Sequence, residues 1–96
     1  MTRHRTMVDA QHVLGANVRR CRLAIGLSQE EVAERMGVDR AYVSGLESGR
    51  RNPTLTTIWA IAQALGVEMS TLVSVAAASD PAPPIRKRAP RRKPTG

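Results

Sequence analysis

The stretch from Ser28 to Gly49 most constrains the fold, because it carries start and stop signals for two short helices joined by a tight turn. Ser28 is a favourable N-cap for the first helix, and Glu31 at the third helical position completes a capping box. Gly37 stands where a left-handed residue commonly ends a helix. Asp39 is placed to cap the second helix, and Gly49 is placed to end it.

Apolar residues support both helix starts. Leu27 precedes the first cap and Val38 precedes the second, and each has a valine five residues later, Val32 and Val43. This is the pattern of the hydrophobic staple. Two capped helices with a glycine-containing turn are typical of the helix-turn-helix unit, which places its second helix in the major groove of DNA.

The preceding segment predicts one amphipathic helix from about Ala10 to Ile25. Its apolar residues recur at spacings of three and four, which place them on one face: Val13, Leu14, Val18, Cys21 and Ile25. Gly26 then ends the helix. We interpret Cys21 as a small buried hydrophobe, because neither a base nor a second cysteine lies near it in the sequence.

Two more helices are predicted after the pair. Thr54 is a good cap for a helix that Gly66 ends, with Pro53 before it. The apolar stripe of this helix is Leu55, Ile58, Ile61, Ala62 and Leu65, with Trp59 beside it. A last short helix is predicted from about Glu68 to Ala77. The prediction is therefore an all-α fold of five helices, with the helix-turn-helix at the second and third.

The chain divides into three parts. Residues 1–9 show no periodicity and predict a flexible arm, and residues 10–78 form the domain. Residues 79–96 hold five of the six prolines and six cations, which predicts a disordered Pro-rich basic tail. The formal net charge is +7, but residues 10–78 contribute only +1. A basic chain favours a polyanionic partner, yet the folded part is nearly neutral.

Several protein classes are disfavoured. One cysteine cannot form an intrachain disulfide, which favours a cytoplasmic location. No apolar run approaches the ~20 residues that span a bilayer, and no apolar segment follows the charged start as in a secretory signal. His4, His12 and Cys21 lack a zinc-ligand spacing, and catalytic constellations are missing. We therefore predict no enzyme activity, cofactor, metal or small-molecule ligand.

Nearly the whole predicted domain carries a resemblance to a known family. Gly26-Leu-Ser-Gln-Glu-Glu-Val-Ala and Met36-Gly-Val-Asp-Arg-Ala-Tyr-Val-Ser-Gly-Leu-Glu-Ser-Gly-Arg-Arg-Asn-Pro-Thr-Leu resemble the Cro/repressor-type (XRE) helix-turn-helix family over residues 14–75. Within it, the run from Asp39 to Glu47 is most similar to controller proteins of restriction–modification systems. The resemblance implies a compact repressor-like domain acting as a homodimer on operator DNA, as a sequence-specific transcriptional regulator.

The outward residues near the start of the third helix are predicted to read bases: Arg40, Ala41, Ser44 and Gly45. Val43 and Leu46 must face inward to hold this helix on the core. Arg40 is the main candidate, because its guanidinium can donate two hydrogen bonds to guanine O6 and N7. A contact with phosphate alone is the alternative. Gly45 has no side chain and can let the helix approach DNA closely.

A second group is predicted to contact DNA phosphates: Gln29, Tyr42, Ser48, Arg50, Arg51 and Asn52. Gln29 matches a family position beside a helix N-terminus, and the alternative is an ordinary exposed residue. The resemblance also implies that Glu47, which would repel phosphate, forms an ion pair with Arg22 and ties the first helix to the third.

The predicted dimer interface is Trp59, Met69, Leu72 and Val73, with completion of the core as the alternative. Two-fold symmetry implies a palindromic operator. The tail either adds non-specific DNA affinity through counterion release or only solubilises the chain. The alternative function is an antitoxin-like or other protein-interaction module, with the tail contacting a partner or nucleic acid.

Overall fold

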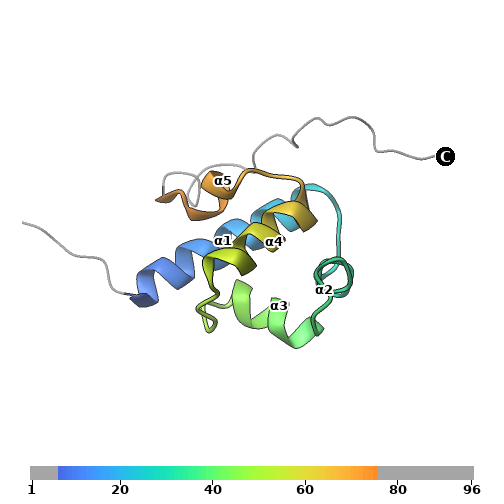
Figure 1. Ribbon diagram of the computed structural model, residues 1–96, viewed down its shortest axis with the longest axis horizontal. Coiled ribbons are helices and arrows are strands. Elements are labelled where there is room, and N and C mark those ends of the chain that lie inside the picture. Colours follow the sequence, from blue (N-terminus) through green and yellow to red (C-terminus); the bar gives the residue numbers. More distant parts are fainter. Residues whose placement is uncertain (1–6, 76–96) are drawn as a thin grey trace, which may run out of the picture.

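The computed structural model describes residues 7–75, which form five helices and no strand. These are α1 (Met7–Ala24), α2 (Gln29–Met36), α3 (Arg40–Glu47), α4 (Leu55–Leu65) and α5 (Met69–Val73). Helix α1 runs through the middle, with α3 and α5 on opposite sides of it (Figure 1), and α2 packs against α3 and α4. The predicted all-α class and order of helices are confirmed.

The predicted helix signals act as expected at most positions. The Ser28 hydroxyl accepts a hydrogen bond from the Glu31 amide at 3.0 Å, and the Glu31 carboxylate accepts one from the Ser28 amide at 2.7 Å. Gly37 follows α2 with φ 73°, the left-handed conformation that glycine adopts without strain. The Thr54 hydroxyl accepts from the amide of Thr57 and caps α4. Local chemistry therefore sets the boundaries of α2 and α4.

Asp39 occupies the N-cap of α3 as predicted, but its side chain makes no capping hydrogen bond. Two other helix ends differ from the prediction. Helix α1 begins at Met7, inside the predicted arm. Helix α5 ends at Val73, four residues before the predicted end, because Ser74 is extended. Leu55, expected in the apolar stripe, is 72% exposed at the first position of α4. The rest of the predicted arm and the whole tail lie outside the described residues.

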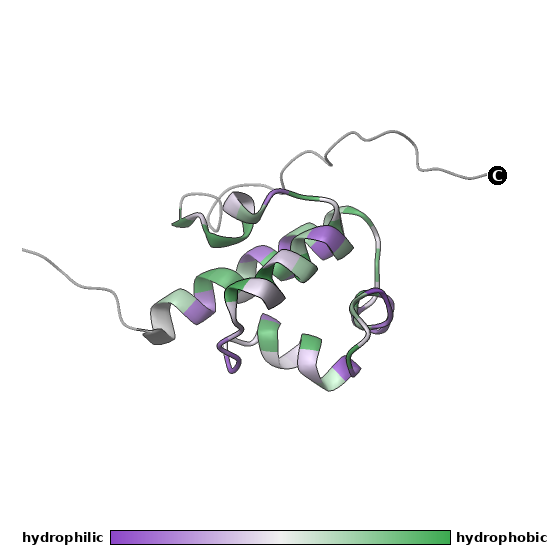
Figure 2. Ribbon diagram, in the orientation of Figure 1, coloured by the Kyte–Doolittle hydropathy of each residue, from purple (hydrophilic) through white to green (hydrophobic). Residues whose placement is uncertain are grey.

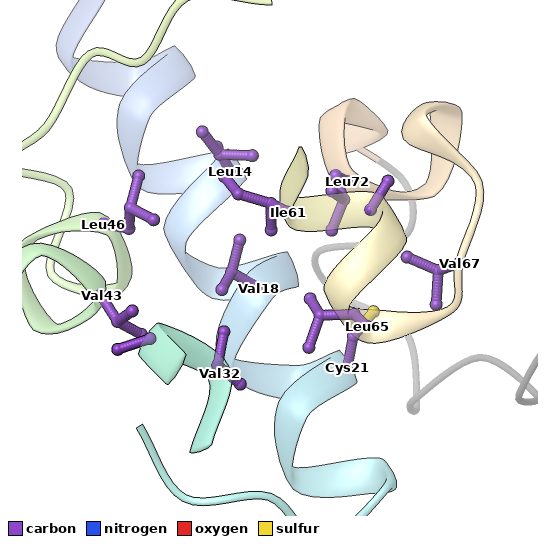
Figure 3. Close-up of a cluster of buried hydrophobic side chains, with 12 residues drawn as sticks. Leu14, Val18, Cys21, Val32, Val43, Leu46, Ile61, Leu65, Val67 and Leu72 are labelled. Atoms are coloured by element: carbon purple, nitrogen blue, oxygen red, sulfur yellow. The ribbon is translucent and has the colours of Figure 1, made fainter. Parts of the chain in front are cut away.

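The core is built from aliphatic side chains of every helix (Figure 3). Its largest fully buried members are Val18, Val32, Val43, Leu46, Ile61, Leu65 and Leu72, with Cys21 among them. Leu72 is 0% exposed, so its assignment to a dimer interface is wrong; it completes the core. Burial also raises the pKa of the Cys21 thiol by desolvation, in keeping with a structural cysteine.

Two contacts of α1 set its distance from its neighbours. A Cβ added at Gly15 would overlap the carbonyl oxygens of Leu46 and Glu47, so only glycine allows α1 and α3 to cross this closely. The Asn17 side chain is fully buried and donates from Nδ2 to the carbonyl oxygens of Leu72 at 2.8 Å and Ser74 at 3.1 Å. A polar side chain thus fixes the end of α5 on α1.

Candidate nucleic-acid interface

Helix α3 presents a short exposed face at its start. Arg40 and Ala41 are exposed and Ser44 is partly buried, while Val43 and Leu46 are buried in the core. This is the predicted orientation for three of the four expected base-reading residues.

Gly45 is the exception, because a side chain of the same protein covers it. Gly45 is buried, and a Cβ built on it would lie 3.0 Å from both Cγ and Nε of Arg51. The prediction that Gly45 faces outward is wrong. The close approach that this glycine permits is with Arg51.

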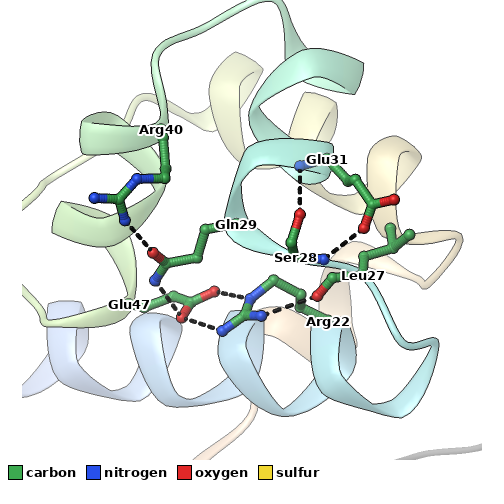
Figure 4. A network of polar contacts seen from close by, with 7 residues as sticks. All are labelled: Arg22, Leu27, Ser28, Gln29, Glu31, Arg40 and Glu47. Carbon is green, nitrogen blue, oxygen red and sulfur yellow. Dashed lines mark hydrogen bonds and ion pairs between the residues drawn. The ribbon is translucent and has the colours of Figure 1, made fainter.

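Arg22 and Glu47 form the predicted ion pair between α1 and α3 (Figure 4). Nε of Arg22 donates to one carboxylate oxygen at 2.6 Å and Nη2 to the other at 2.9 Å, while Nη1 donates to the Leu27 carbonyl at 2.9 Å. The side chains are 8% and 5% exposed. The hydrogen bond from Arg22 to Glu47 raises the pKa of the guanidinium, which stays charged.

The same carboxylate also holds Gln29, at the start of α2. Nε2 of Gln29 donates to Oε1 of Glu47 at 3.0 Å, and its Oε1 accepts from Nη1 of Arg40 at 2.9 Å. Figure 4 shows this continuous chain of side chains from α1 through α3 and α2 to the exposed start of α3. The buried ion pair therefore connects, through Gln29, to the main candidate base reader.

A polar hollow of about 480 Å³ lies beside this network, at the N-terminus of α2. Its lining comes from α1, α2 and α3: Arg19, Arg22, Ser28, Gln29, Glu30 and Arg40. A helix N-terminus and nearby guanidinium groups favour an anion. Arg19 was missed by the sequence reasoning; its spacing of three residues from Arg22 is the signal that places both on one side of α1.

The loop after α3 is strongly hydrophilic (Figure 2), and it folds back onto the helix. The Gly45 carbonyl accepts from the Ser48 hydroxyl at 3.2 Å and from the Arg50 amide at 2.9 Å. The guanidinium of Arg51 lies over the Tyr42 ring, 5.1 Å from its centroid. The predicted phosphate-contacting residues Ser48, Arg50, Arg51 and Asn52 are all exposed in this loop, and Tyr42 is partly buried beside it.

Of the remaining predicted interface residues, Trp59 and Met69 line one depression, whereas Val73 lies at a separate groove. Val73 is 53% exposed and, with Val75, lines an apolar groove of about 340 Å³ whose other walls come from α1, α4 and the loop residues Asn52 and Pro53. Trp59 is 55% exposed and lines other depressions on α4. Met69 is partly buried and packs against the core.

Within residues 7–75, no helix is long and apolar enough to cross a membrane.

Comparison with known proteins identifies the family of the chain. The sequence profile of a helix-turn-helix family, HTH_3, matches residues 18–72. An uncharacterised HTH-type transcriptional regulator of Sinorhizobium fredii, y4dJ, is 48% identical over 67 residues, which cover 70% of this chain and 87% of that protein. The control protein C.SmaI of Serratia marcescens is 37% identical over 67 residues, covering 70% of this chain and 80% of that protein.

A solved structure shares the fold as well as the sequence. The restriction-modification controller protein C.AhdI from Aeromonas hydrophila aligns with a TM-score of 0.62 at 44% identity, covering 65% of this chain and 94% of that chain. The chain is therefore similar to restriction–modification controller proteins in both sequence and fold. It belongs to the HTH_3 helix-turn-helix family of DNA-binding transcriptional regulators.

Proposed function

We propose that this protein is a sequence-specific transcriptional regulator that binds double-stranded DNA as a homodimer, with α3 in the major groove. The observation that carries the proposal is the position of Arg40. It lies exposed on the first turn of α3, and Gln29 holds its guanidinium while Glu47 holds Gln29. A guanidinium so held is suited to a bidentate contact with guanine, because less side-chain freedom is lost on binding.

Groups suited to phosphates flank this position on both sides. Arg19 and Gln29 line the hollow at the start of α2, and Arg50, Arg51 and Asn52 extend from the loop after α3. Local clustering thus offsets the small net charge of the folded part. Ala41 and Ser44 complete the proposed base-contacting surface. With one long polar base reader, we expect DNA shape to supply part of the specificity.

The dimer surface is proposed at Val73, together with Val75 and Ile58, which line the same apolar groove. The arrangement of the helices supports the proposal because α5 and α3 lie on opposite sides of α1 (Figure 1), so a second copy packed on Val73 leaves the exposed start of α3 accessible. Asn52 and Pro53, on the loop after α3, also line this groove. Two-fold pairing predicts a palindromic operator. Analytical ultracentrifugation tests it: Val73→Asp should yield monomers, whereas Trp59→Ser should not. Dimers in Val73→Asp and monomers in Trp59→Ser would instead indicate an interface at Trp59.

Selection of bound sequences from random duplex DNA tests the function itself. A palindromic enriched site supports both DNA reading and dimerisation. A library without enrichment contradicts the proposal and favours the protein-interaction alternative. A regulator that works on DNA also implies a cytoplasmic location, which fractionation checks.

A further inference from the structure

The basic loop after α3 is anchored on a single residue of that helix. The Gly45 carbonyl accepts hydrogen bonds from the Ser48 hydroxyl and the Arg50 amide. The Arg51 side chain packs against the α-carbon of Gly45, where any other residue would carry its Cβ. The guanidinium of Arg51 continues over the face of the Tyr42 ring. Gly45 and Tyr42 thus lie on two sides of one long, exposed cationic side chain, and we call these two residues the arginine seat.

The geometry points to the arginine seat as a positioning device: Gly45 and Tyr42 hold Arg51 so that its guanidinium contacts a DNA phosphate from a fixed position. This inference rests on the proposed function. In it, Gly45 and Tyr42 promote DNA binding by holding Arg51 in place. A cation over an aromatic face is attracted by the negative potential of the ring. A side chain already restrained in this way loses less conformational freedom when it binds.

Glycine is required at position 45 for the seat, but the fold itself tolerates alanine there. The nearest atoms to an added Cβ are Cγ, Nε and Cδ of Arg51, at 3.0, 3.0 and 3.5 Å. These belong to a flexible exposed side chain, which can move aside. Gly45→Ala should therefore leave α3 folded, since alanine favours a helix, while it displaces Arg51 from the Tyr42 ring.

The first test needs no DNA. The Arg51 side-chain NMR resonances should be shifted by the Tyr42 ring in the full chain. Gly45→Ala and Tyr42→Leu should both remove this shift, whereas Tyr42→Phe, which keeps the ring, should preserve it. Unchanged Arg51 resonances in both Gly45→Ala and Tyr42→Leu would overturn the seat, whatever the protein binds.

The second test measures DNA affinity against salt concentration on the selected site. Loss of one phosphate contact lowers the slope of log K against log salt by about 0.9. Arg51→Ala and Gly45→Ala should each show this fall, and the double variant should show no further fall. Arg50→Ala is the matched control: its effect should add to that of Gly45→Ala.

The outcomes separate the two proposals. If the unmodified protein binds no DNA, the proposed function fails and phosphate positioning fails with it, while the first test still reports on the seat. If the protein binds DNA and Arg51→Ala or Gly45→Ala leaves the slope unchanged, the positioning role is overturned and the proposed function stands.

Discussion

The carboxylate of Glu47 lies 2.6 Å from Nε of Arg22, across the point where α1 and α3 cross. Both side chains are nearly fully buried, and the remaining oxygen of Glu47 is shared with Gln29. A carboxylate on the helix proposed to meet DNA is therefore turned away from phosphate and neutralised by a buried guanidinium. Removing its charge should affect folding before it affects binding.

We expect Glu47→Gln to lower the free energy of unfolding by about 3–5 kcal/mol, because it leaves the charge of Arg22 buried without a counter-charge. Urea unfolding followed by circular dichroism measures this. Glu34→Gln, a change of the same kind at an exposed position of α2, is the control. A loss below about 1 kcal/mol for Glu47→Gln would mean that the pair behaves as a solvent-exposed one.

Acid should weaken the capping box of α2. Hydrogen bonds from the backbone and side chain of Ser28 hold the pKa of Glu31 below its ordinary value. The resulting stabilisation is present above the unfolded-state pKa, about 4.3, and is lost as the pH falls through the lower folded-state pKa. The destabilisation caused by Glu31→Gln should shrink over that range.

A carboxyl-detected NMR titration checks this cause directly. Ser28→Ala should raise the pKa of Glu31 only part of the way towards its ordinary value, because alanine keeps the backbone amide that lowers it most. It should also cost about 1 kcal/mol of stability through the lost cap. Ser70→Ala removes an exposed hydroxyl on α5 and serves as the control. An equal Glu31 pKa in the unmodified protein and Ser28→Ala would exclude the Ser28 hydroxyl as a cause and leave the backbone amide, which alanine keeps.

Gly15→Ala should destabilise the fold although alanine is the better helix former. The new Cβ would overlap the carbonyl oxygens of Leu46 and Glu47 and push α1 from α3, at a cost of about 1–3 kcal/mol. Ala16→Gly, at the neighbouring exposed position, should lose only about 0.5–1 kcal/mol. Thermal unfolding compares them. A gain of stability in Gly15→Ala would mean that the crossing has room to relax.

Arg40→Lys should relax base specificity. Lysine keeps the charge but lacks the planar fork, so discrimination at the contacted base pair should fall by about 1–3 kcal/mol. The ratio of Kd values for the selected site and a site changed at that pair measures it. Arg50→Lys is the control, since a phosphate contact depends mainly on charge. Equal ratios for Arg40→Lys and the unmodified protein would mean that Arg40 contacts only the DNA backbone.

The sequence determines the helices well because their signals are local. Ser28, Gly37, Thr54 and Gly66 act within one turn of their own helix, so their patterns predict the boundaries found. Asp39 shows the limit, because a capping residue type does not guarantee a capping hydrogen bond.

The features that escaped prediction depend on contacts between distant segments. Asn17 donates hydrogen bonds to carbonyls more than fifty residues away. The requirement for glycine at position 15 arises only because α3 crosses α1 there. Gly45 looks DNA-facing by helical position, and only the return of the following loop buries it. The Arg22–Glu47 pair joins residues 25 positions apart, and the family resemblance predicted it where periodicity could not.

The polar chain from Arg22 to Arg40 has a consequence for anyone who wishes to redirect this protein to a new DNA sequence. Gln29 and Glu47 each support more than one neighbour, so altering them would change folding and recognition together. Ala41 is exposed on the same helical turn as Arg40 and contributes only a methyl group. A library of longer side chains at Ala41 should therefore yield altered sequence preferences on an undisturbed scaffold.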